Sequence, residues 1–209
     1  MVEEARLAQV ASGLAPVTPG WFVVNARDAA WMNNDRREAC CIFESDDFVL
    51  QGRPDLTEYV KPGAGFVLRV LRPGLPTGLY HAESVQEDFL VLQGECILIV
   101  EDEERHLRAW DFVHCPPGTG HTFVGAGDGP CILVCTGNRD LNDETFWRIS
   151  KRSDTAMRYG ASVEHDTTSD SEADANVPWR GRWRVERPEN WDELLWGSTD
   201  IAPPTEEAP

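Results

Sequence analysis

Two histidines and two glutamates are spaced so that they could bind one metal ion. In the segment YHAESVQE (80–87), His81, Glu83 and Glu87 are separated by two and four positions. Alternate residues of a β-strand face the same side, so His81 and Glu83 can point into one cavity, and Glu87 keeps that parity if the strand continues. Taken alone, the segment is better explained as a strand whose histidine is a surface or hydrogen-bonded residue than as part of a metal site.

A second segment, WDFVHCPPGTGHTF (110–123), supplies the other histidine. Pro116, Pro117 and Gly118 predict a rigid turn, which fixes the direction of the strand that follows and aims His121 at the same cavity. Two imidazoles and two carboxylates could then surround a divalent ion and leave positions open for water or substrate.

Short strands must position these side chains. Between Trp21 and Asn138, runs rich in β-branched and aromatic residues alternate with glycine- and proline-rich breaks, which is typical of an antiparallel all-β sandwich or barrel. Gly94-Glu95 predicts a tight type II′ hairpin with a positive φ at Gly94, and the segment EDEE (101–104) predicts a second turn. The absence of β-α-β alternation argues against a Rossmann-type sheet.

The flanking segments have a different texture. EEARLAQVASGL (3–14) and DETFWRISKRSDTAMRYGA (143–161) predict helices, the second capped by Asp143, and the acidic stretch 165–176 is predicted to be flexible. We expect the last segment to pack on the barrel or on a neighbouring subunit, because it holds four tryptophans: Trp179, Trp183, Trp191 and Trp196. The chain thus divides into an N-terminal arm (1–20), a β-barrel (21–138) and a C-terminal extension (139–209).

Composition excludes several classes of function. The net charge of −17 disfavours binding to nucleic acid or to an anionic membrane surface, and no apolar run approaches the ~20 residues of a membrane span. The acidic first residues lack the apolar core of a signal peptide, so a cytoplasmic protein is expected. None of the six cysteines forms a C-x-x-C pair, which predicts buried, reduced thiols at Cys40, Cys41, Cys96, Cys115, Cys131 and Cys135.

Both histidine segments resemble the motifs of the cupin superfamily. His81, Glu83, Glu87 and Gly94 match the first motif, roughly G-x5-H-x-H-x3,4-E-x6-G, and Pro116, Gly118 and His121 match the second, roughly G-x5-P-x-G-x2-H-x3-N. The resemblance covers about residues 60–137. It implies a jelly-roll β-barrel of antiparallel strands with short helices in the terminal extensions, a homodimer, and a divalent ion (zinc, manganese or iron) on His81, Glu83, Glu87 and His121.

This sequence departs from the family pattern at functionally important positions. Glu83 stands where the family usually has a histidine, so the ion would have two carboxylate ligands instead of one. Trp110 and Gly125 replace the first glycine and the asparagine of the second motif. Of the remaining histidines, His114 is expected to be structural or adjacent to the site, and neither His106 nor His165 is expected to bind the ion.

The resemblance implies a metal-dependent enzyme acting on a small organic molecule, of dioxygenase, isomerase or lyase type. Its catalytic residues are not assigned by the sequence; without an ion, Glu83 or Glu87 could act as a general base. Two alternatives stay open. One is a non-catalytic module that binds a small ligand, with a structural metal or none, and the other is a structural subunit whose tryptophan-rich segment mediates assembly.

Overall fold

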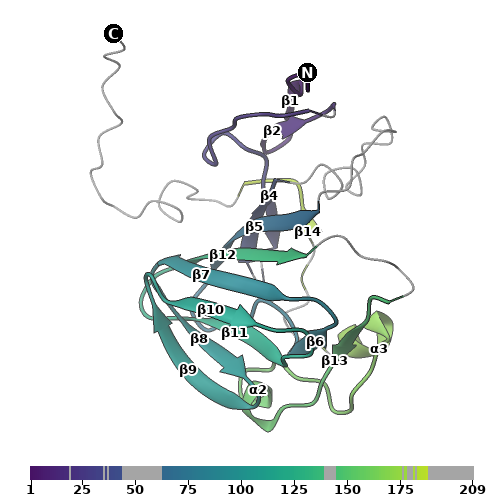
Figure 1. Cartoon of the computed structure of the whole chain (residues 1–209). Coiled ribbons are helices and arrows are strands. Elements are labelled where there is room, and N and C mark those ends of the chain that lie inside the picture. Colours follow the sequence, from purple (N-terminus) through teal and green to yellow (C-terminus); the bar gives the residue numbers. More distant parts are fainter. Residues whose placement is uncertain are drawn as a thin grey trace.

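The chain folds mainly as antiparallel β-sheet, with few and short helices (Figure 1). The computed structural model describes residues 1–18, 20–34, 36, 38–43, 63–138, 145–175, 177, 181 and 183–187. This confirms the predicted all-β, cupin-type jelly roll with short helices outside the barrel. The division into arm, barrel and extension stays a prediction.

Two larger sheets carry the fold. Within the described residues, the first has seven strands in the order β10 (Phe112–Cys115), β7 (Glu87–Gln93), β12 (Cys131–Asn138), β5 (Ala64–Leu71), β4 (Glu38–Ile42), β3 (Met32–Asn34) and β14 (Trp183–Arg184). The second has five, in the order β13 (Arg148–Ser150), β6 (His81–Glu83), β11 (His121–Ala126), β8 (Glu95–Val100) and β9 (Glu103–Arg108). Consecutive strands such as β6 and β7 lie in different sheets, so segments close in sequence face each other across the interior.

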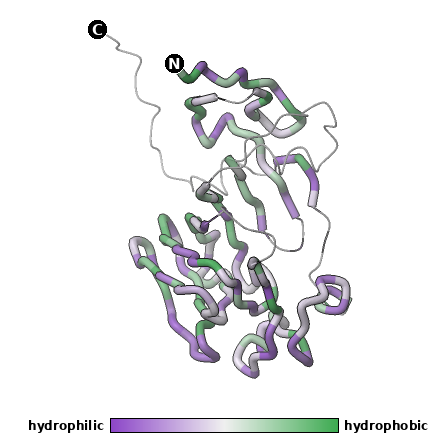
Figure 2. Tube along the Cα trace, turned by 45° about the vertical axis from the view of Figure 1, so that its right-hand side comes forward, coloured by the Kyte–Doolittle hydropathy of each residue, from purple (hydrophilic) through white to green (hydrophobic). Residues whose placement is uncertain are grey.

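The main core lies between the two sheets. Alternate residues of facing strands point inward, and Figure 2 shows hydrophobic and hydrophilic residues alternating along these strands. The fully buried members come from β5, β7, β8, β10, β11 and β12: Leu71, Phe89, Val91, Cys96, Leu98, Cys115, Phe123, Cys131 and Leu133. All six cysteines are free, as predicted; five are buried and Cys135 is half-buried.

The N-terminal segment covers part of the outer face of the first sheet. Trp31 and Ala29 pack there against Val70 and Ile132. The helix predicted over residues 3–14 is wrong: β1 (Leu7–Val10) and β2 (Gly13–Pro16) form a hairpin instead. Tertiary contacts here outweigh the helix propensity of the alanine-rich segment. The backbone at position 13 lies so close to Ala29 that only glycine fits, because a Cβ there would lie 2.3 Å from the Ala29 carbonyl oxygen.

Gly94 does not form the predicted hairpin. It has the expected positive φ of +74°, but it links β7 to β8, which belong to different sheets. A Cβ at this position would lie 2.4 Å from the carbonyl oxygen of Pro130. The chain therefore passes from the first sheet to the second at Gly94. The second predicted turn is confirmed, since Glu101 and Asp102, both with positive φ, connect the paired strands β8 and β9.

The extension forms different elements from those predicted. The helix expected over residues 143–161 is wrong in its first half, where β13 pairs with β6; α2 (Asp154–Met157) follows, capped by the Ser153 hydroxyl. Asp143 lies outside the described residues. The acidic stretch, predicted to be flexible, contains the short helix α3 (Asp170–Asp174), capped by Ser169. Residues 148–150 form a strand instead of the predicted helix because β13 pairs with β6, a contact between segments far apart in the sequence.

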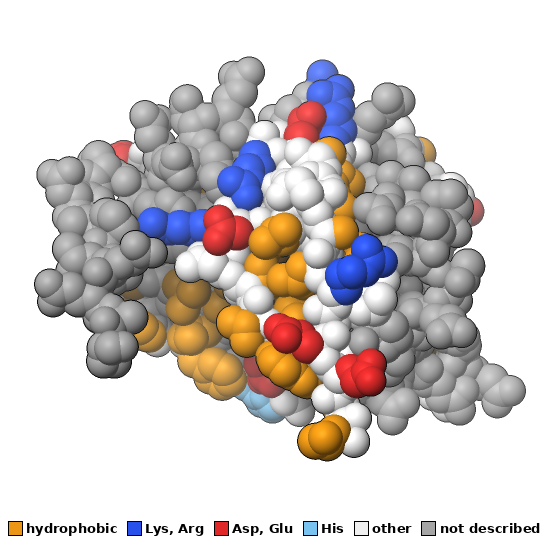
Figure 3. All heavy atoms as spheres, turned by 90° about the horizontal axis from the view of Figure 1, so that it is seen from above, with side chains coloured by type: hydrophobic (Ala, Val, Ile, Leu, Met, Phe, Trp, Pro, Cys, Tyr) orange, Lys and Arg blue, Asp and Glu red, His pale blue; other side chains and the backbone are white. Residues whose placement is uncertain are grey.

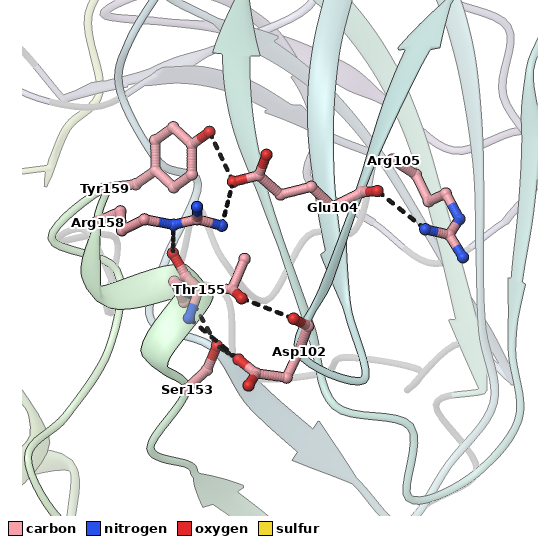
Figure 4. Close-up of polar contacts among 8 residues, drawn as sticks. Asp102, Glu104, Arg105, Ser153, Thr155, Arg158 and Tyr159 are labelled. Atoms are coloured by element: carbon pink, nitrogen blue, oxygen red, sulfur yellow. Dashed lines mark hydrogen bonds and ion pairs between the residues drawn. The ribbon is translucent and has the colours of Figure 1, made fainter.

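A polar cluster fastens the extension to the β8–β9 turn; we call it the clasp (Figure 4). The Asp102 carboxylate accepts hydrogen bonds from the Ser153 hydroxyl (2.5 Å) and the Thr155 amide (3.1 Å), which hold its pKa below the ordinary value. Glu104 accepts from the Arg158 guanidinium at 2.7 Å. Because β13 directly precedes α2 in the chain, the clasp also helps to hold β13 on the barrel.

The tryptophan-rich segment is described only in part. Trp183 pairs with β3 and packs against Met32, Cys40 and Val67. Trp179, Trp191 and Trp196 lie outside the described residues, so packing of the whole segment stays a prediction.

Charge is distributed in both signs over the end of the molecule seen from above in Figure 3. There the described hydrophobic side chains form a strip bordered by both acidic and basic side chains. No helix in the described part of the chain is long and apolar enough to cross a membrane.

Candidate metal centre

Three of the four predicted ligands converge in the interior. His81 and His121 begin β6 and β11 and lie directly opposite each other in the antiparallel pair, with ring centroids 5.0 Å apart. Glu87 begins β7 on the other sheet. One ligand atom from each residue lies within 4.8 Å of the others. The group therefore joins both sheets of the barrel.

Backbone carbonyls orient both imidazoles. His81 Nδ1 lies 2.8 Å from the Leu79 carbonyl oxygen, and His121 Nδ1 lies 3.1 Å from that of Thr119. A carbonyl oxygen can only accept, so each Nδ1 carries the proton and donates it. The tautomer assigned from these partners leaves the Nε2 lone pair of each ring directed into the interior, as in histidines that bind metals.

Both Nε2 atoms then face carboxylate oxygens. His121 Nε2 lies 3.3 Å from Glu87 Oε2, and His81 Nε2 lies 3.6 Å from Glu83 Oε1. A neutral imidazole with Nδ1 protonated offers a lone pair to each carboxylate, and two acceptors repel at such distances. A cation between them, either a proton or a metal ion, removes the repulsion.

Burial disfavours protonation of either imidazole at Nε2. Desolvation lowers the pKa of His81 well below its ordinary value, with further lowering by the charges of Arg148 and His121. Desolvation also lowers the pKa of His121, against an opposing contribution from the hydrogen bond to Thr119. Both rings are therefore neutral near pH 7, the form in which histidine binds metals.

The spacing of one pair of these atoms suits a divalent ion. Two donors about 2.1 Å from one ion, at the angles of tetrahedral or octahedral coordination, are separated by about 3.0–3.4 Å. The 3.3 Å between His121 Nε2 and Glu87 Oε2 falls in this range. Two imidazole nitrogens and one carboxylate suit zinc, manganese or iron, and leave coordination positions for water or substrate.

Glu83 lies beside this group and is not part of it. Its carboxylate is 3.4 Å from the guanidinium Nε of Arg148, which sits opposite Glu83 in the β13–β6 pair. An arginine from the extension thus competes with the ion for the carboxylate that stands where cupins usually have a histidine. Coordination by Glu83 stays a prediction.

A cavity of about 200 Å³ opens beside the ligands. Phe89, whose ring centroid lies 5.2 Å from that of His121 and 4.6 Å from that of Phe123, forms part of its apolar wall. Two arginines also line the cavity, Arg148 from β13 and Arg69 from β5.

Sequence reasoning missed both arginines. Arg69 interrupts the apolar run GFVLRVLR, and a single charge in the middle of a central strand is the signal that could have found it. Its side chain forms an ion pair with Glu38 of the neighbouring strand, whose side chain is only 1% exposed. Arg148 lay within a segment predicted to be helical, so sequence gave no reason to place it at the cavity.

The other candidate residues lie elsewhere. His114 is exposed, with its Nδ1 2.6 Å from Asp88 Oδ1, and lies outside the ligand group; His106 and His165 are exposed on the surface. Cys96 and Cys115 are buried, and burial raises the pKa of the Cys115 thiol to about 12, which keeps it neutral. Cys135 lines the cavity, also with a pKa raised by burial to about 12.

The two sheets and the ligand group fall mainly within one segment of the chain that matches a known family. The family model for the cupin domain matches residues 67–137, which include His81, Glu83, Glu87 and His121. This segment of the chain is a cupin domain.

Several solved structures are similar to part of this chain at low sequence identity. A candidate sugar phosphate isomerase from Acidithiobacillus ferrooxidans is 21% identical, with 53% of this chain and 63% of that chain covered and a TM-score of 0.40. The polyketide cyclase RemF from Streptomyces resistomycificus is 13% identical (57% and 80% covered, TM-score 0.44), and KdgF from Halomonas sp. is 16% identical (61% and 99%, TM-score 0.43). The chain thus spans under two thirds of the first of these proteins. A search of curated proteins found no match.

Proposed function

We propose that this protein is a metal-dependent enzyme acting on a small organic molecule, with a divalent ion held by His81, Glu87 and His121. The observation that carries the proposal is the convergence of two neutral imidazole nitrogens and a carboxylate, each imidazole fixed by a backbone carbonyl. Such an ion would polarise a substrate oxygen or activate water or O₂ in the adjoining cavity. The cupin domain and the range of activities named for its structural neighbours agree with this class and do not select a reaction.

Glu83 is proposed as a fourth ligand that the ion can recruit. Its carboxylate Oε1 lies 3.6 Å from His81 Nε2 and 3.4 Å from Arg148 Nε. A divalent ion would compete with the arginine for this oxygen. Replacing Arg148 by methionine should then strengthen metal binding by releasing Glu83, and Glu83→Gln should weaken it by less than the loss of Glu87.

Metal binding is tested by titration of the dialysed, untagged protein with zinc, manganese and iron(II) under anaerobic conditions, followed by calorimetry. We expect one ion per chain, and loss of binding in His121→Ala. His106→Ala, an exposed histidine on β9, serves as the matched control and should bind as the wild type does. Equal binding by His121→Ala and the wild type contradicts the site.

A turnover assay distinguishes the proposed enzyme from a non-catalytic binding module. An enzyme converts a ligand that binds in the cavity and loses conversion when the ion is removed by a chelator, whereas a binding module releases the ligand unchanged. Homodimerisation and a cytoplasmic location are predictions of the same proposal; light scattering on the eluted protein measures the first, and cell fractionation the second.

A further inference from the structure

We infer that the cavity binds a small organic carboxylate, and that Arg69 on the inner wall receives the carboxylate group. This inference rests on the proposed metal site, which it extends to the class of substrate. The metal ligands and Arg69 line the same cavity.

An arginine is energetically unfavourable at position 69. β5 lies between β12 and β4 in the centre of the seven-stranded sheet, and the neighbours of Arg69 in register are Leu133 and Cys40. A charged side chain pointing inward from such a strand must be paired or solvated. Here the pairing partner, Glu38, is built into the adjacent strand and is itself buried.

Only part of the guanidinium is used by this pairing. Nη1 donates to Glu38 Oε1, and the Cys135 thiol makes a further side-chain contact. A guanidinium has five N–H donors in a planar fork. The Cys40 thiol lies close enough to interact electrostatically as well, yet 31% of the Arg69 side chain is still exposed. Since Arg69 lines the cavity, its remaining donors are available there to a ligand.

Geometry and charge both favour a carboxylate. The fork of an arginine matches the two oxygens of a carboxylate, and a guanidinium fixed by Glu38 is oriented before the ligand arrives. With a divalent ion bound, two arginines and the ion outweigh the carboxylates of Glu38, Glu83 and Glu87 by one positive charge. A monoanion therefore neutralises the cavity, in a chain whose net charge is −17.

The apolar part of the ligand has a place as well. Val67, Phe89, Phe123 and Leu133 also line the cavity and give it an apolar wall. The volume of about 200 Å³ restricts the ligand to a small molecule. A short carbon skeleton with a carboxylate at one end and an oxygen for the ion at the other matches this distribution of groups.

The test compares carboxylates with amides of the same shape by ¹⁹F NMR on the zinc-loaded full chain. The probes are 3,3,3-trifluorolactate against its amide, and 4-fluorobenzoate against 4-fluorobenzamide. We expect the better carboxylate to bind about 10-fold or more tightly than its amide, because charge-assisted hydrogen bonds to the guanidinium are lost with the charge. The preference should disappear in Arg69→Met and persist in Arg105→Met, which removes an exposed arginine on β9.

A second variant protects the test against misfolding. Arg69→Met leaves Glu38 buried without its arginine, so Glu38→Gln combined with Arg69→Met removes both charges and keeps the volumes close. Loss of carboxylate preference in this folded double variant supports the inference. Equal affinity for acid and amide in the wild type, or a preference that survives in the double variant, overturns it. Tighter Arg69-dependent binding of inorganic phosphate than of either carboxylate overturns the choice of carboxylate.

Failure of the metal site gives a different result. Zinc affinity is measured on the same samples by competition with a chelator. A wild-type protein that binds no zinc refutes the proposed function, and the acid–amide comparison on that metal-free protein still reports on Arg69.

Discussion

Removing Arg69 should destabilise the protein far more than removing its partner Glu38. Arg69→Met leaves a carboxylate whose side chain is 1% exposed, whereas Glu38→Gln leaves a guanidinium that is 31% exposed and can be hydrated through the cavity. Breaking a buried pair from one side costs about 3–5 kcal/mol. We therefore expect a loss of about 3 kcal/mol for Arg69→Met and about 1 kcal/mol for Glu38→Gln.

The double variant should recover most of that loss. Two neutral side chains of similar volume remove the buried charge, so the double variant is expected within about 1 kcal/mol of the wild type, a coupling of at least about 3 kcal/mol. Urea denaturation at equilibrium gives the free energies of unfolding, and the expected fall in melting temperature for Arg69→Met is about 6–12 °C.

An exposed pair provides the comparison. Glu103 and Arg105 form an ion pair with side chains 63% and 59% exposed, for which the same cycle should give no more than about 0.5 kcal/mol. If the losses for Arg69→Met and Glu38→Gln simply add in the double variant, the reasoning from burial is refuted.

Three further predictions concern backbone, pH and the clasp. Gly94→Ala should destabilise the fold by about 1–2 kcal/mol because of the positive φ, and further because the new Cβ would clash with Pro130. Gly74 also has a positive φ, but a Cβ there meets nothing within 4 Å, so Gly74→Ala should lose only the part due to φ. Thermal melts compare the two variants. Because folding lowers the pKa of His81 and of His121, the unfolded metal-free chain binds protons at a higher pH than the folded chain does. The free energy of unfolding should therefore decrease as the pH falls below ~6.5, by at most about 1.4 kcal/mol per pH unit for each histidine. Urea titrations between pH 7 and 5 measure this decrease. Asp102→Ala should raise amide exchange in α2 without changing exchange in β12; unchanged α2 protection contradicts the clasp.

Sequence predicted the all-β class and the convergence of His81, Glu87 and His121 because both depend on local pattern. The Pro116–Gly118 turn directs the strand that begins with His121, and the strand periodicity of the segment around His81 is visible without partners. The all-β class and the free cysteines follow in the same way from short apolar runs and cysteine spacing.

The failures involve strand partners, which the local pattern does not specify. A glycine between two strands has the same positive φ whether the strands pair or diverge, so the segment around Gly94 could not show that its strands join different sheets. Likewise, Arg148 reached the cavity because β13 adds to the edge of β6, a contact between residues more than 60 positions apart. The Glu38–Arg69 pair also depends on which strands are neighbours.

The placement of the ligands on both sheets has a consequence for the kinetics of an ion bound there. His81 and His121 belong to one sheet and Glu87 to the other, so an ion held by all three would cross-link the two sheets. The dissociation rate of the ion would then depend on how readily the two sheets move relative to each other. Loosening the Phe89–Phe123 contact that packs between the sheets should speed metal exchange while leaving every ligand in place.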